Sequence, residues 1–552
     1  MTSRTERWDA VVIGSGFGGA MAAYRLMQAG ARVLMIERGS WVERGPSAWR
    51  DDSSLAFTPS YARDIRYSVI AEGRPEQDIG SYACVGGPSV FYGGTSFRYR
   101  VEDFIGDADV IAASGAAWPC RYPDIEPYYT EAEALLSIAG DDSCDPTAPP
   151  RSAPFPQSPA PLAPISKRIV AAAQALKLSP FSLPLAIHYG ASPRRPLAQG
   201  SPRIPILASS PSTSASDVFA ANAARAACVT CSTCDTYACA IEAKNDIATM
   251  MIRPLLARGL VLWTDTVAVR LEESGQRVRR LYVHRKDSGV MQSVEADLFV
   301  LAAGALGTPH LILSSKLEEH SPARGSVGRY LMRHNNAMVF GGFASKPNPE
   351  RRFHKQIAIH DYYFGDRDAR DVMGMRKLGG IQQVMPPSAH LVMTQLSWKQ
   401  EAVVRSLVEH STGLLCIAED QPQSENRVSV DWSTRDSYGL PRLVIHHRYS
   451  ARDQQALAAL VRRAKRVLRK AGAWVFYTHQ VSTFSHAVGT VRAGVDPATS
   501  PLDEDCRFRG LHNLWITCGS ALPLSAAVNP SLTIAANALR VSDRIVATMG
   551  KA

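Results

Sequence analysis

The feature that most constrains this chain is a glycine-rich stretch at residues 9–39. An apolar run at 10–13, the length of a buried strand, leads into glycines at G-x-G-x-x-G spacing. Apolar residues at helical spacing follow, and a second apolar run at 33–36 ends on Glu37. The pattern predicts a strand, a tight turn, a helix and a second strand, the unit that binds a dinucleotide. A glycine-rich turn in an unrelated α/β domain is the alternative.

Each glycine of this unit has a physical task. Gly14 permits the tight turn, Gly16 lets the backbone approach a pyrophosphate, and Gly19 lets helix and strand pack closely. The phosphates would then lie at the positive end of the helix. Glu37 can accept hydrogen bonds from ribose hydroxyls and would repel a 2′-phosphate, which disfavours NADP. The unit alone does not distinguish FAD from NAD.

Length and composition narrow the class of protein. The 552 residues exceed one ordinary hydrophobic core, so we expect two domains or one elaborated domain. With 45% hydrophobic and 20% charged residues, the composition is globular. The net charge is +10, but the densest basic patch, at 462–470, fits the solvated face of a helix. We therefore expect no nucleic-acid partner.

The sequence shows neither a membrane span nor a secretion signal. No apolar run approaches the roughly 20 residues of a transmembrane segment. The N-terminus, MTSRTERWDA, lacks the apolar core of a signal peptide. We therefore expect a cytoplasmic protein whose ten cysteines are mostly reduced.

Further segments divide the chain. Residues 84–98 hold two Gly-Gly pairs within nine residues, which indicates backbone passing close to a phosphate or a flat group. Residues 145–217 are rich in Pro, Ser and Ala, and are either an insertion at the substrate entrance or a plain surface loop. Alternating runs between 335 and 447 predict an antiparallel sheet. Helices are expected at 125–139, 310–315, 454–471 and 533–547.

With these pieces in place, the sequence resembles the glucose-methanol-choline (GMC) family of flavin oxidoreductases over nearly its whole length. The motifs are GSGFGG at 14–19, VGGPSVFYGG at 85–94, CAIEAKND at 239–246, LAAGALGTPHLIL at 301–313, VGRYLMRH at 327–334, HAVGTVRAG at 486–494 and NPSLTIAANALRVSDRI at 529–545. The resemblance implies an α/β fold, in which a Rossmann-like FAD-binding domain is built from separated segments. A substrate domain with an antiparallel sheet and helices accompanies it.

The expected division of the chain follows from this resemblance. Residues 1–140 would be the first part of the FAD-binding domain, 141–225 a Pro/Ser-rich insertion on the substrate side, 226–334 the second FAD-binding part with a cysteine cluster, 335–480 the substrate domain, and 481–552 the third FAD-binding part with the active-site residues. No histidine lies between Gly86 and Ser96, so the covalent histidyl link of some members is not expected. The FAD is therefore expected to be non-covalent.

The resemblance also implies which residues form the site. Ser89 to Gly94 would lie along the isoalloxazine, and Val267 would meet the adenine through its backbone. His486 matches the family's active-site histidine, and Asn529 its second active-site residue. The residues expected to contact FAD are Gly14, Ser15, Gly16, Phe17, Gly18, Gly19, Glu37, Arg38, Gly86, Gly87, Ser89, Tyr92, Gly93, Gly94, Val267, Ala303, Gly304, Gly519, Ser520, Asn529, Pro530 and Ser531.

The chemistry of alcohol oxidation suits these residue types. An alcohol loses a hydroxyl proton and a hydride, and flavin N5 takes the hydride. A neutral imidazole such as His486 can accept the proton, and the Asn529 amide can hold the oxygen without adding charge. The alternatives are a structural histidine in a turn and a turn asparagine before Pro530. His310, His334 and His479 lack such context and are predicted to be structural or on the surface.

Four cysteines form a separate motif. Cys228, Cys231, Cys234 and Cys239 have the spacing C-x2-C-x2-C-x4-C, which can ligate an iron–sulfur cluster or zinc. Buried thiols, or one disulfide such as Cys234–Cys239, are the favoured interpretation, since the spacing departs from that of ferredoxins.

Three functions remain open at this point. The main hypothesis is FAD-dependent oxidation of a sugar, sterol or aromatic alcohol, with oxygen or a quinone or redox partner as electron acceptor. The second is a catalytic subunit that passes electrons through a cysteine-bound iron–sulfur cluster to a partner. The third is a non-redox lyase or isomerase on the same fold.

Overall fold

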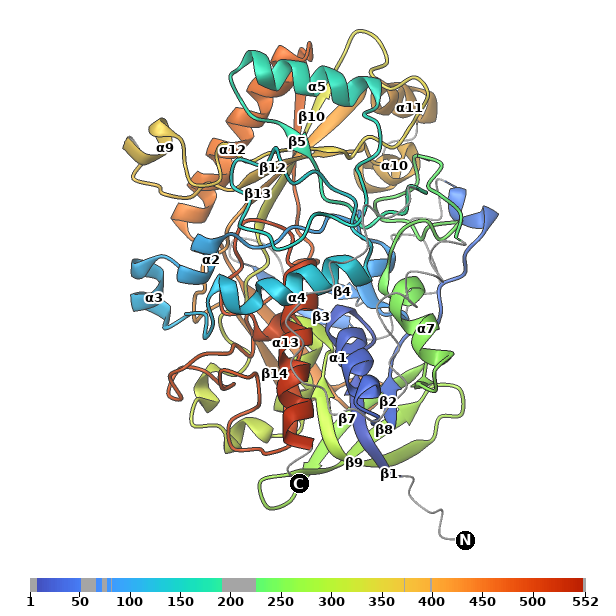
Figure 1. Ribbon diagram of the computed structural model, residues 1–552, viewed down its shortest axis with the longest axis vertical. Helices are drawn as coiled ribbons and strands as arrows, with labels where there is room; N and C mark the ends of the chain where they lie inside the picture. Colours follow the sequence, from blue (N-terminus) through green and yellow to red (C-terminus); the bar gives the residue numbers. More distant parts are fainter. Residues whose placement is uncertain are drawn as a thin grey trace.

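The strand–turn–helix unit predicted at the N-terminus lies at the centre of a mixed sheet (Figure 1). β1 (Arg7–Ile13) pairs in parallel with β2 (Val33–Ile36), and α1 (Phe17–Gln28) connects them, which confirms the prediction for this stretch. The computed structural model describes residues 7–50, 66–71, 77–80, 82–190, 225–371, 373–397 and 400–549.

Strands from distant parts of the chain complete this sheet, whose order is β6-β2-β1-β9-β8-β7. β9 is parallel to β1, and its last residues pair in parallel with β17 near the C-terminus. The nucleotide-binding fold is therefore built from separated segments, as the sequence predicts. The added strands are β6 (Val261–Trp263), β7 (Thr266–Glu273), β8 (Val278–Arg285), β9 (Met291–Leu301) and β17 (Leu514–Ile516).

Close backbone contacts hold the glycine turn against the sheet. Gly14 has a φ of +106°, and a β-carbon there would lie 2.4 Å from the carbonyl oxygen of Ala302. A β-carbon on Gly19 would lie 1.9 Å from the carbonyl oxygen of Gly14. Any side chain at either position would push helix α1 away from the strands.

Helix α1 packs beside α13 (Ser531–Met549), and α13 in turn contacts α4 (Tyr122–Leu135) (Figure 1). These two helices correspond to the predictions at 533–547 and 125–139. α8 (Gly304–Ser314) begins six residues before the predicted helix at 310–315, because the turn Ala303-Gly304 leads directly into helical backbone.

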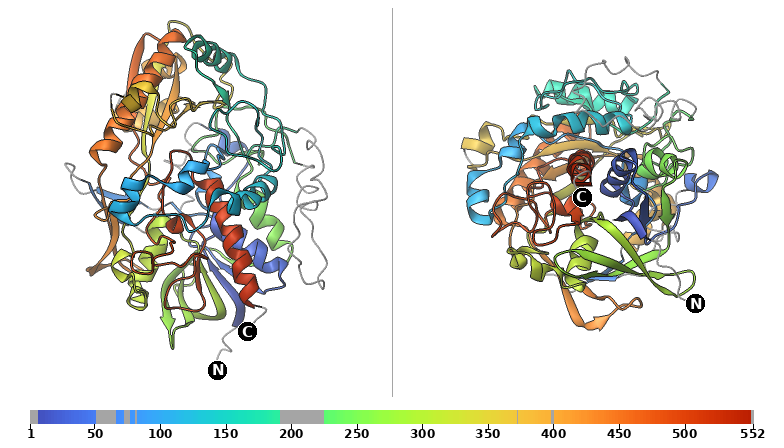
Figure 2. Two further views of the ribbon diagram at one scale, coloured as in Figure 1. Left: turned by 60° about the vertical axis from the view of Figure 1, so that its left-hand side comes forward. Right: turned by 60° about the horizontal axis from the view of Figure 1, so that its bottom comes forward.

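A second, antiparallel sheet lies at the opposite end of the molecule from β1 (Figures 1 and 2). α12 (Ala451–Lys470) and α5 (Pro164–Ala175) contact this sheet and each other through a separate apolar core. Its order is β16 (Val475–Gln480), β10 (Asn335–Gly342), β13 (Ser411–Ala418), β12 (Gly380–Val384), β11 (Ile357–Ile359) and β5 (Phe181–Ser182). The antiparallel sheet predicted within 335–447 is therefore confirmed.

A third, smaller sheet was not predicted. β15 pairs in parallel with β3, so residues far apart in the sequence meet there. The strands are β14 (Arg427–Arg435), β15 (Pro441–His447), β3 (Arg66–Ala71) and β4 (Gln77–Gly80). The alternating run at 427–430 thus belongs to a different sheet from the runs at 337–343 and 414–418, because β14 pairs with β15 and not with a strand of the second sheet.

Short helices complete the described structure. They are α2 (Val101–Ile105), α3 (Ala108–Ser114), α7 (Arg253–Leu256), α9 (Arg367–Asp371), α10 (Ala389–Leu396), α11 (Glu401–Glu409), the 3₁₀ turns η1 (Pro46–Trp49), η3 (Gly87–Val90), η5 (Leu317–His320), η6 (Arg324–Ser326) and η7 (Gly519–Ala521), and the π-helical turn η4 (Ala248–Ile252).

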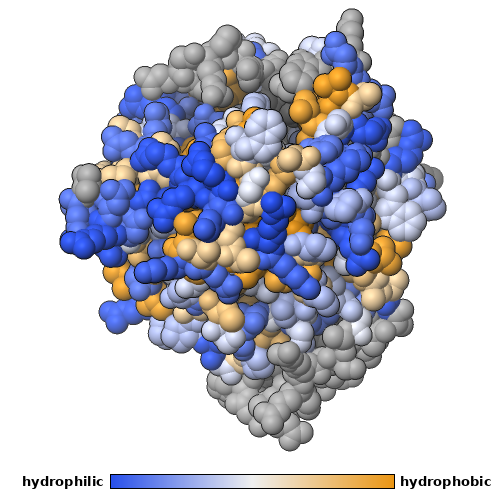
Figure 3. Space-filling view, turned by 90° about the horizontal axis from the view of Figure 1, so that it is seen from above, coloured by the Kyte–Doolittle hydropathy of each residue, from blue (hydrophilic) through white to orange (hydrophobic). Residues whose placement is uncertain are grey.

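In the part of the chain that the structure describes, no helix has both the length and the apolar character needed to cross a membrane. Figure 3 shows a largely hydrophilic surface at the α5 end, with small hydrophobic patches.

The Pro/Ser-rich region is more ordered than its composition predicts. Within it, α5 packs on α12, and β5 is the edge strand of the antiparallel sheet. Residues 191–224 of this region lie outside the described residues. The five-part division of the chain remains a prediction, although its insertion contributes directly to the second sheet.

A buried arginine ties the 85–94 loop to α4. Arg98 follows this loop and is 3% exposed. Its guanidinium lies 2.8 Å from carboxylate oxygens of both Glu126 and Glu133 on α4. Glu133 also contacts Arg151, so the ion pairs form a network that excludes water.

Replacing Arg98 with methionine should lower the free energy of unfolding by on the order of 3 kcal/mol, because buried carboxylates lose their cation. A thermal melt should show a lower melting temperature. The control is Arg367→Met, which breaks an exposed pair with Asp371 and should change the melting temperature little. Equal melting temperatures for the two variants would contradict the structural role of Arg98.

Candidate active site

Ser15 joins three parts of the predicted cofactor site. Its hydroxyl donates to the Glu37 carboxylate at 2.6 Å and accepts from the backbone N–H of Gly86 at 3.0 Å. The backbone N–H groups of Ser15 and Gly39 donate to the same carboxylate at 3.1 and 2.9 Å. The acid that was predicted to bind ribose is therefore buried and oriented by hydrogen bonds from the glycine turn.

The residues around this turn fit the pyrophosphate of a dinucleotide. Gly16 and Ala303 are the N-cap residues of α1 and α8, and neither helix end has a side-chain cap. Their first N–H groups are thus available to an anion at the positive end of each helix. A β-carbon on Gly16 would meet nothing within 4 Å, so open space lies before α1. A β-carbon on Gly87 would lie 3.2 Å from the Cα of Gly16, so the loop at 85–94 passes close to the glycine turn.

Other predicted cofactor residues line the same region through their backbones. Gly18 packs on the carbonyl of Thr517, next to the buried pair Gly519-Ser520. Val267 lies at the start of β7, directly after Thr266. The N–H of Thr266 donates to the carbonyl oxygen of Glu37 at 3.0 Å, so the start of β7 lies beside Glu37. Arg38 instead points to the third sheet and donates to the Tyr67 hydroxyl at 3.1 Å.

The loop at 85–94 uses its polar side chains to hold its own shape. The Ser89 hydroxyl donates to the Gly86 carbonyl at 2.6 Å and accepts from the N–H of Ile247 at 3.0 Å. The Tyr92 hydroxyl donates to the Asn245 carbonyl at 3.0 Å. These side chains are already satisfied within the protein, so contacts of this loop with a flavin would come from backbone and ring surfaces.

An ion pair that sequence reasoning missed lies over Gly93. Lys355 Nζ and Asp235 Oδ1 are 2.9 Å apart, and a β-carbon on Gly93 would collide with both groups. Lys355 is 6% exposed, and its positive charge acts on His486. Lys355 lies outside every motif, and Asp235 is an unspecified position within the cysteine motif, so only the tertiary structure pairs them.

His486 and Asn529, the predicted catalytic pair, are brought together. His486 lies in the loop after β16, and Asn529 lies two residues before α13. Asn529 Nδ2 is 3.3 Å from His486 Nε2. Gln382 on β12 donates through Nε2 to Asn529 Oδ1 at 2.8 Å, so the antiparallel sheet orients the amide. Pro530 is buried behind it, and the Ser531 hydroxyl donates to the Thr95 carbonyl.

His334 is a further residue at this site. Its Nδ1 lies 3.0 Å from Nδ1 of His486, and its Nε2 lies 2.8 Å from the carbonyl oxygen of Ser525. A surface position for His334 is therefore wrong, because the residue is buried, whereas a structural role stays a prediction. It ends the motif at 327–334, but no sequence spacing pairs it with a residue in a distant loop. His310 bonds to the Pro441 carbonyl instead, and His479 lies on β16.

The surroundings keep both imidazoles neutral near pH 7. Burial lowers the pKa of His486 well below its ordinary value, and the neighbouring His334 and Lys355 lower it further. Burial also lowers the pKa of His334, which is opposed in part by its bond to Ser525 and by the charge of Asp420. A neutral His486 can accept a proton, which is the state required of a general base.

The cysteine motif forms no evident metal centre. Every cysteine that the structure describes, including Cys228, Cys231, Cys234 and Cys239, is a free thiol. Among the described residues, no group of three or more His, Cys, Asp or Glu side chains could hold a metal ion. Burial raises the pKa of the Cys228 thiol to about 11 and also raises that of Cys234. These observations favour free thiols over a disulfide, although the four cysteines are half-buried rather than buried.

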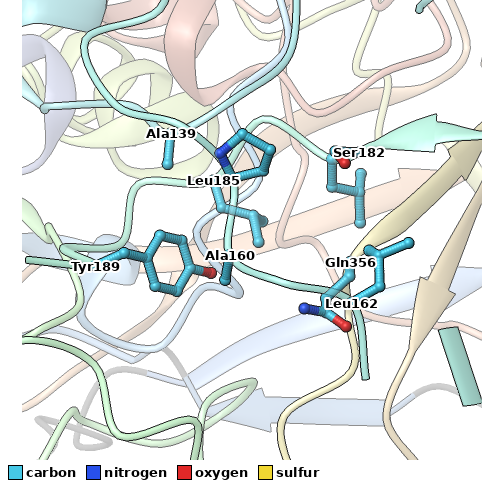
Figure 4. A pocket seen from close by; sticks show the side chains of 9 residues that line it. Ala139, Ala160, Leu162, Ser182, Leu185, Tyr189 and Gln356 are labelled. Carbon is cyan, nitrogen blue, oxygen red and sulfur yellow. The ribbon is translucent and has the colours of Figure 1, made fainter. Parts of the chain in front are cut away.

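A small cavity lies beside this region, with room for about one water molecule (Figure 4). Tyr189 and Gln356 flank it, and Ala139, Ala160, Leu162 and Leu185 supply apolar walls. None of its lining residues is a predicted site residue, so it is distinct from the place where His486 and Asn529 meet.

Comparisons with known proteins agree with this geometry. Models described as GMC oxidoreductase match residues 213–336 and 422–538, and an FAD binding domain model matches residues 9–60. The chain is 30% identical to 6'''-hydroxyparomomycin C oxidase of Streptomyces lividus and 29% identical to paromamine 6'-oxidase of Streptomyces fradiae; each match covers 98% of this chain and 91% of the relative.

A solved structure shows the same fold. Pyridoxine 4-oxidase from Mesorbium loti superposes with a TM-score of 0.61 at 17% identity, over 97% of this chain and 98% of that one. The family models, the full-length relatives and the fold converge on one conclusion: the chain belongs to the GMC oxidoreductase family and is an FAD-binding oxidoreductase.

Proposed function

We propose that this protein oxidises an alcohol with non-covalently bound FAD, with His486 as the proton acceptor. The observation that carries the proposal is the contact of Asn529 Nδ2 with Nε2 of a neutral His486. FAD, when bound, supplies the hydride acceptor. The residues that would hold it are the glycine turn, Ser15, Glu37 and the loop at 85–94.

The His486–Asn529 contact is where the hydroxyl would bind. At 3.3 Å it is longer than an ordinary N–H hydrogen bond, so an incoming oxygen can exchange for it. The hydroxyl would donate to His486 Nε2 and accept from Asn529 Nδ2. His486 then takes the proton, while Gln382 holds the amide in place.

Polar groups near this contact favour a hydrophilic substrate. Lys355 and Asp235 form their ion pair beside it, and Gln382 is fully buried with its Oε1 unpaired. We infer a hydroxyl-rich, sugar-like alcohol rather than a sterol or an aromatic alcohol. The names of the two oxidases that are about 30% identical support this class, and also oxygen as the electron acceptor. A quinone or redox partner is the other acceptor class.

The flavin absorption measured without oxygen distinguishes a lyase or isomerase from an alcohol oxidoreductase. A lyase or isomerase would leave the flavin oxidised when its substrate is added without oxygen, whereas an alcohol oxidoreductase would bleach the visible flavin absorption. A screen of sugars and aminoglycosides, with a sterol and an aromatic alcohol for comparison, therefore tests both the reaction and the substrate class.

Replacing His486 with glutamine should slow flavin reduction at least about 100-fold, because the proton acceptor is lost. The FAD content should be unchanged. Asn529→Ala should have a smaller effect, because the amide orients the alcohol and accepts no proton. Anaerobic stopped-flow with a substrate from the screen measures these rates. His479→Gln is the control; near wild-type reduction of the His486 variant would show that the base lies elsewhere.

The rate of flavin reduction should depend on pH in a defined way. Because the pKa of His486 lies well below the ordinary value of 6.5, its base form persists as the pH falls through that value. The rate at saturating substrate should therefore stay constant through pH 6.5 and decline only well below it. Flavin fluorescence at each pH controls for loss of FAD. A decline centred at or above the ordinary value would contradict the neutral, buried base.

Acid precipitation should release the flavin into the supernatant, because no histidine lies in the loop from Gly86 to Ser96. Absorption spectra of the supernatant and of the washed pellet measure the distribution. Yellow colour that stays with the denatured pellet would show a covalent link.

A further inference from the structure

We propose that His334 is a positioning residue that holds His486 in its Nδ1–H tautomer, which leaves Nε2 unprotonated and aimed at the substrate. The consequence for catalysis rests on the proposed function, whereas the tautomer itself is a property of the protein. His486 lies within a chain of hydrogen bonds that runs from Ser525 to Gln382. Each end of this chain leads independently to the same tautomer of His486.

The first end is the carbonyl of Ser525. A carbonyl oxygen can only accept, so His334 Nε2, 2.8 Å away, must carry a hydrogen. A neutral His334 then has a lone pair at Nδ1. The Nδ1 of His486 lies 3.0 Å from His334 Nδ1, and the contact is a hydrogen bond only if His486 Nδ1 donates.

The second end is Gln382. Its Nε2 donates to Asn529 Oδ1 at 2.8 Å, which turns the other end of the amide, the NH₂ group, toward His486. An NH₂ group donates, so His486 Nε2 must present its lone pair. The opposite tautomer would place two donors face to face at Nε2 and two lone pairs face to face at Nδ1. Burial leaves little water to relieve either clash.

His334 is held rigidly enough to impose this choice. Its backbone has a φ of +61°, in the left-handed region, and the Tyr449 hydroxyl donates to its carbonyl at 2.9 Å. Met332 and Val488 exchange backbone hydrogen bonds of 3.0 and 2.8 Å. These bonds join the segment before β10, which carries His334, to the loop that carries His486. The two rings therefore approach each other from segments that are already joined.

Nearby charges act in both directions on this pair of rings when the reaction supplies a proton. The alcohol O–H bond breaks and an N–H bond forms at His486 Nε2, while Nδ1 goes on donating to His334. Asp420 is fully buried, accepts from the N–H of Arg333 at 2.8 Å, and favours positive charge on His334. Lys377 opposes positive charge on His334, and Lys355 opposes it on His486, so the pair returns readily to its neutral form.

The tautomer can be read directly by nitrogen NMR. In protein with FAD bound and ¹⁵N-labelled only at histidine, a protonated ring nitrogen resonates well upfield of an unprotonated one. The spectrum of His486→Gln identifies the His486 signals by their loss. We expect Nδ1 of His486 to be protonated and Nε2 not to be. A wild-type spectrum with the proton on Nε2 overturns the inference.

Variants of His334 then test cause. His334→Ala should shift the tautomer population of His486 toward Nε2–H, the form that free histidine prefers and that Asn529 alone then opposes, and should slow flavin reduction at least about 10-fold, because part of the enzyme then lacks a free Nε2 lone pair. His334→Asn should retain the Nδ1–H form, because its amide oxygen can accept where Nδ1 did and asparagine tolerates the left-handed backbone. An unchanged tautomer in the alanine variant also overturns the inference.

The matched control is His310→Ala, which removes another buried histidine that bonds to a backbone carbonyl, that of Pro441. It should leave the His486 signals and the reduction rate unchanged. Failure of the proposed function looks different: no alcohol would reduce the flavin, while the tautomer stays as assigned. If flavin reduction is lost in His486→Gln but the wild-type His486 carries its proton on Nε2, only the role of His334 is rejected.

Discussion

The structure depends on the close approach of the glycine turn to the ends of the central strands. Gly14 and Gly19 leave no space for a side chain between the turn, α1 and Ala302, and Gly18 packs in the same way on Thr517. These contacts hold three distant parts of the chain together at one place. Ser15 then links the turn to Glu37 and Gly86, so the cofactor region forms as a single hydrogen-bonded unit.

The antiparallel sheet has a matching task on the other side of the site. Gln382 on β12 reaches across to Asn529, at the start of the C-terminal helix of the FAD-binding part. His334, just before β10, reaches His486 in the same way. Each residue of the predicted catalytic pair is thus supplied by one part of the fold and contacted by a residue of the other. Low solvent access makes these hydrogen bonds decisive, because an unsatisfied donor or acceptor there is costly.

Burial also decides the charge state of the site. Positive charge on His486 is disfavoured by desolvation, His334 and Lys355, so the imidazole is neutral and could accept a proton. The Lys355–Asp235 pair nevertheless places a cation close to the reacting groups. A site with a neutral imidazole at His486 and a charged pair beside it suits an uncharged hydroxyl on a polar substrate.

The sequence by itself determined the nucleotide-binding unit and the pair His486 and Asn529, since glycine spacing, apolar periodicity and family motifs are local properties of the chain. It also predicted the antiparallel sheet and the separated construction of the FAD-binding part. Only the tertiary structure decided the third sheet, the partners of Asn529 and the contact of His334 with His486. The physical reason is that hydrogen bonds between side chains 147 or 152 residues apart leave no periodic signal; they arise when packing brings the segments together.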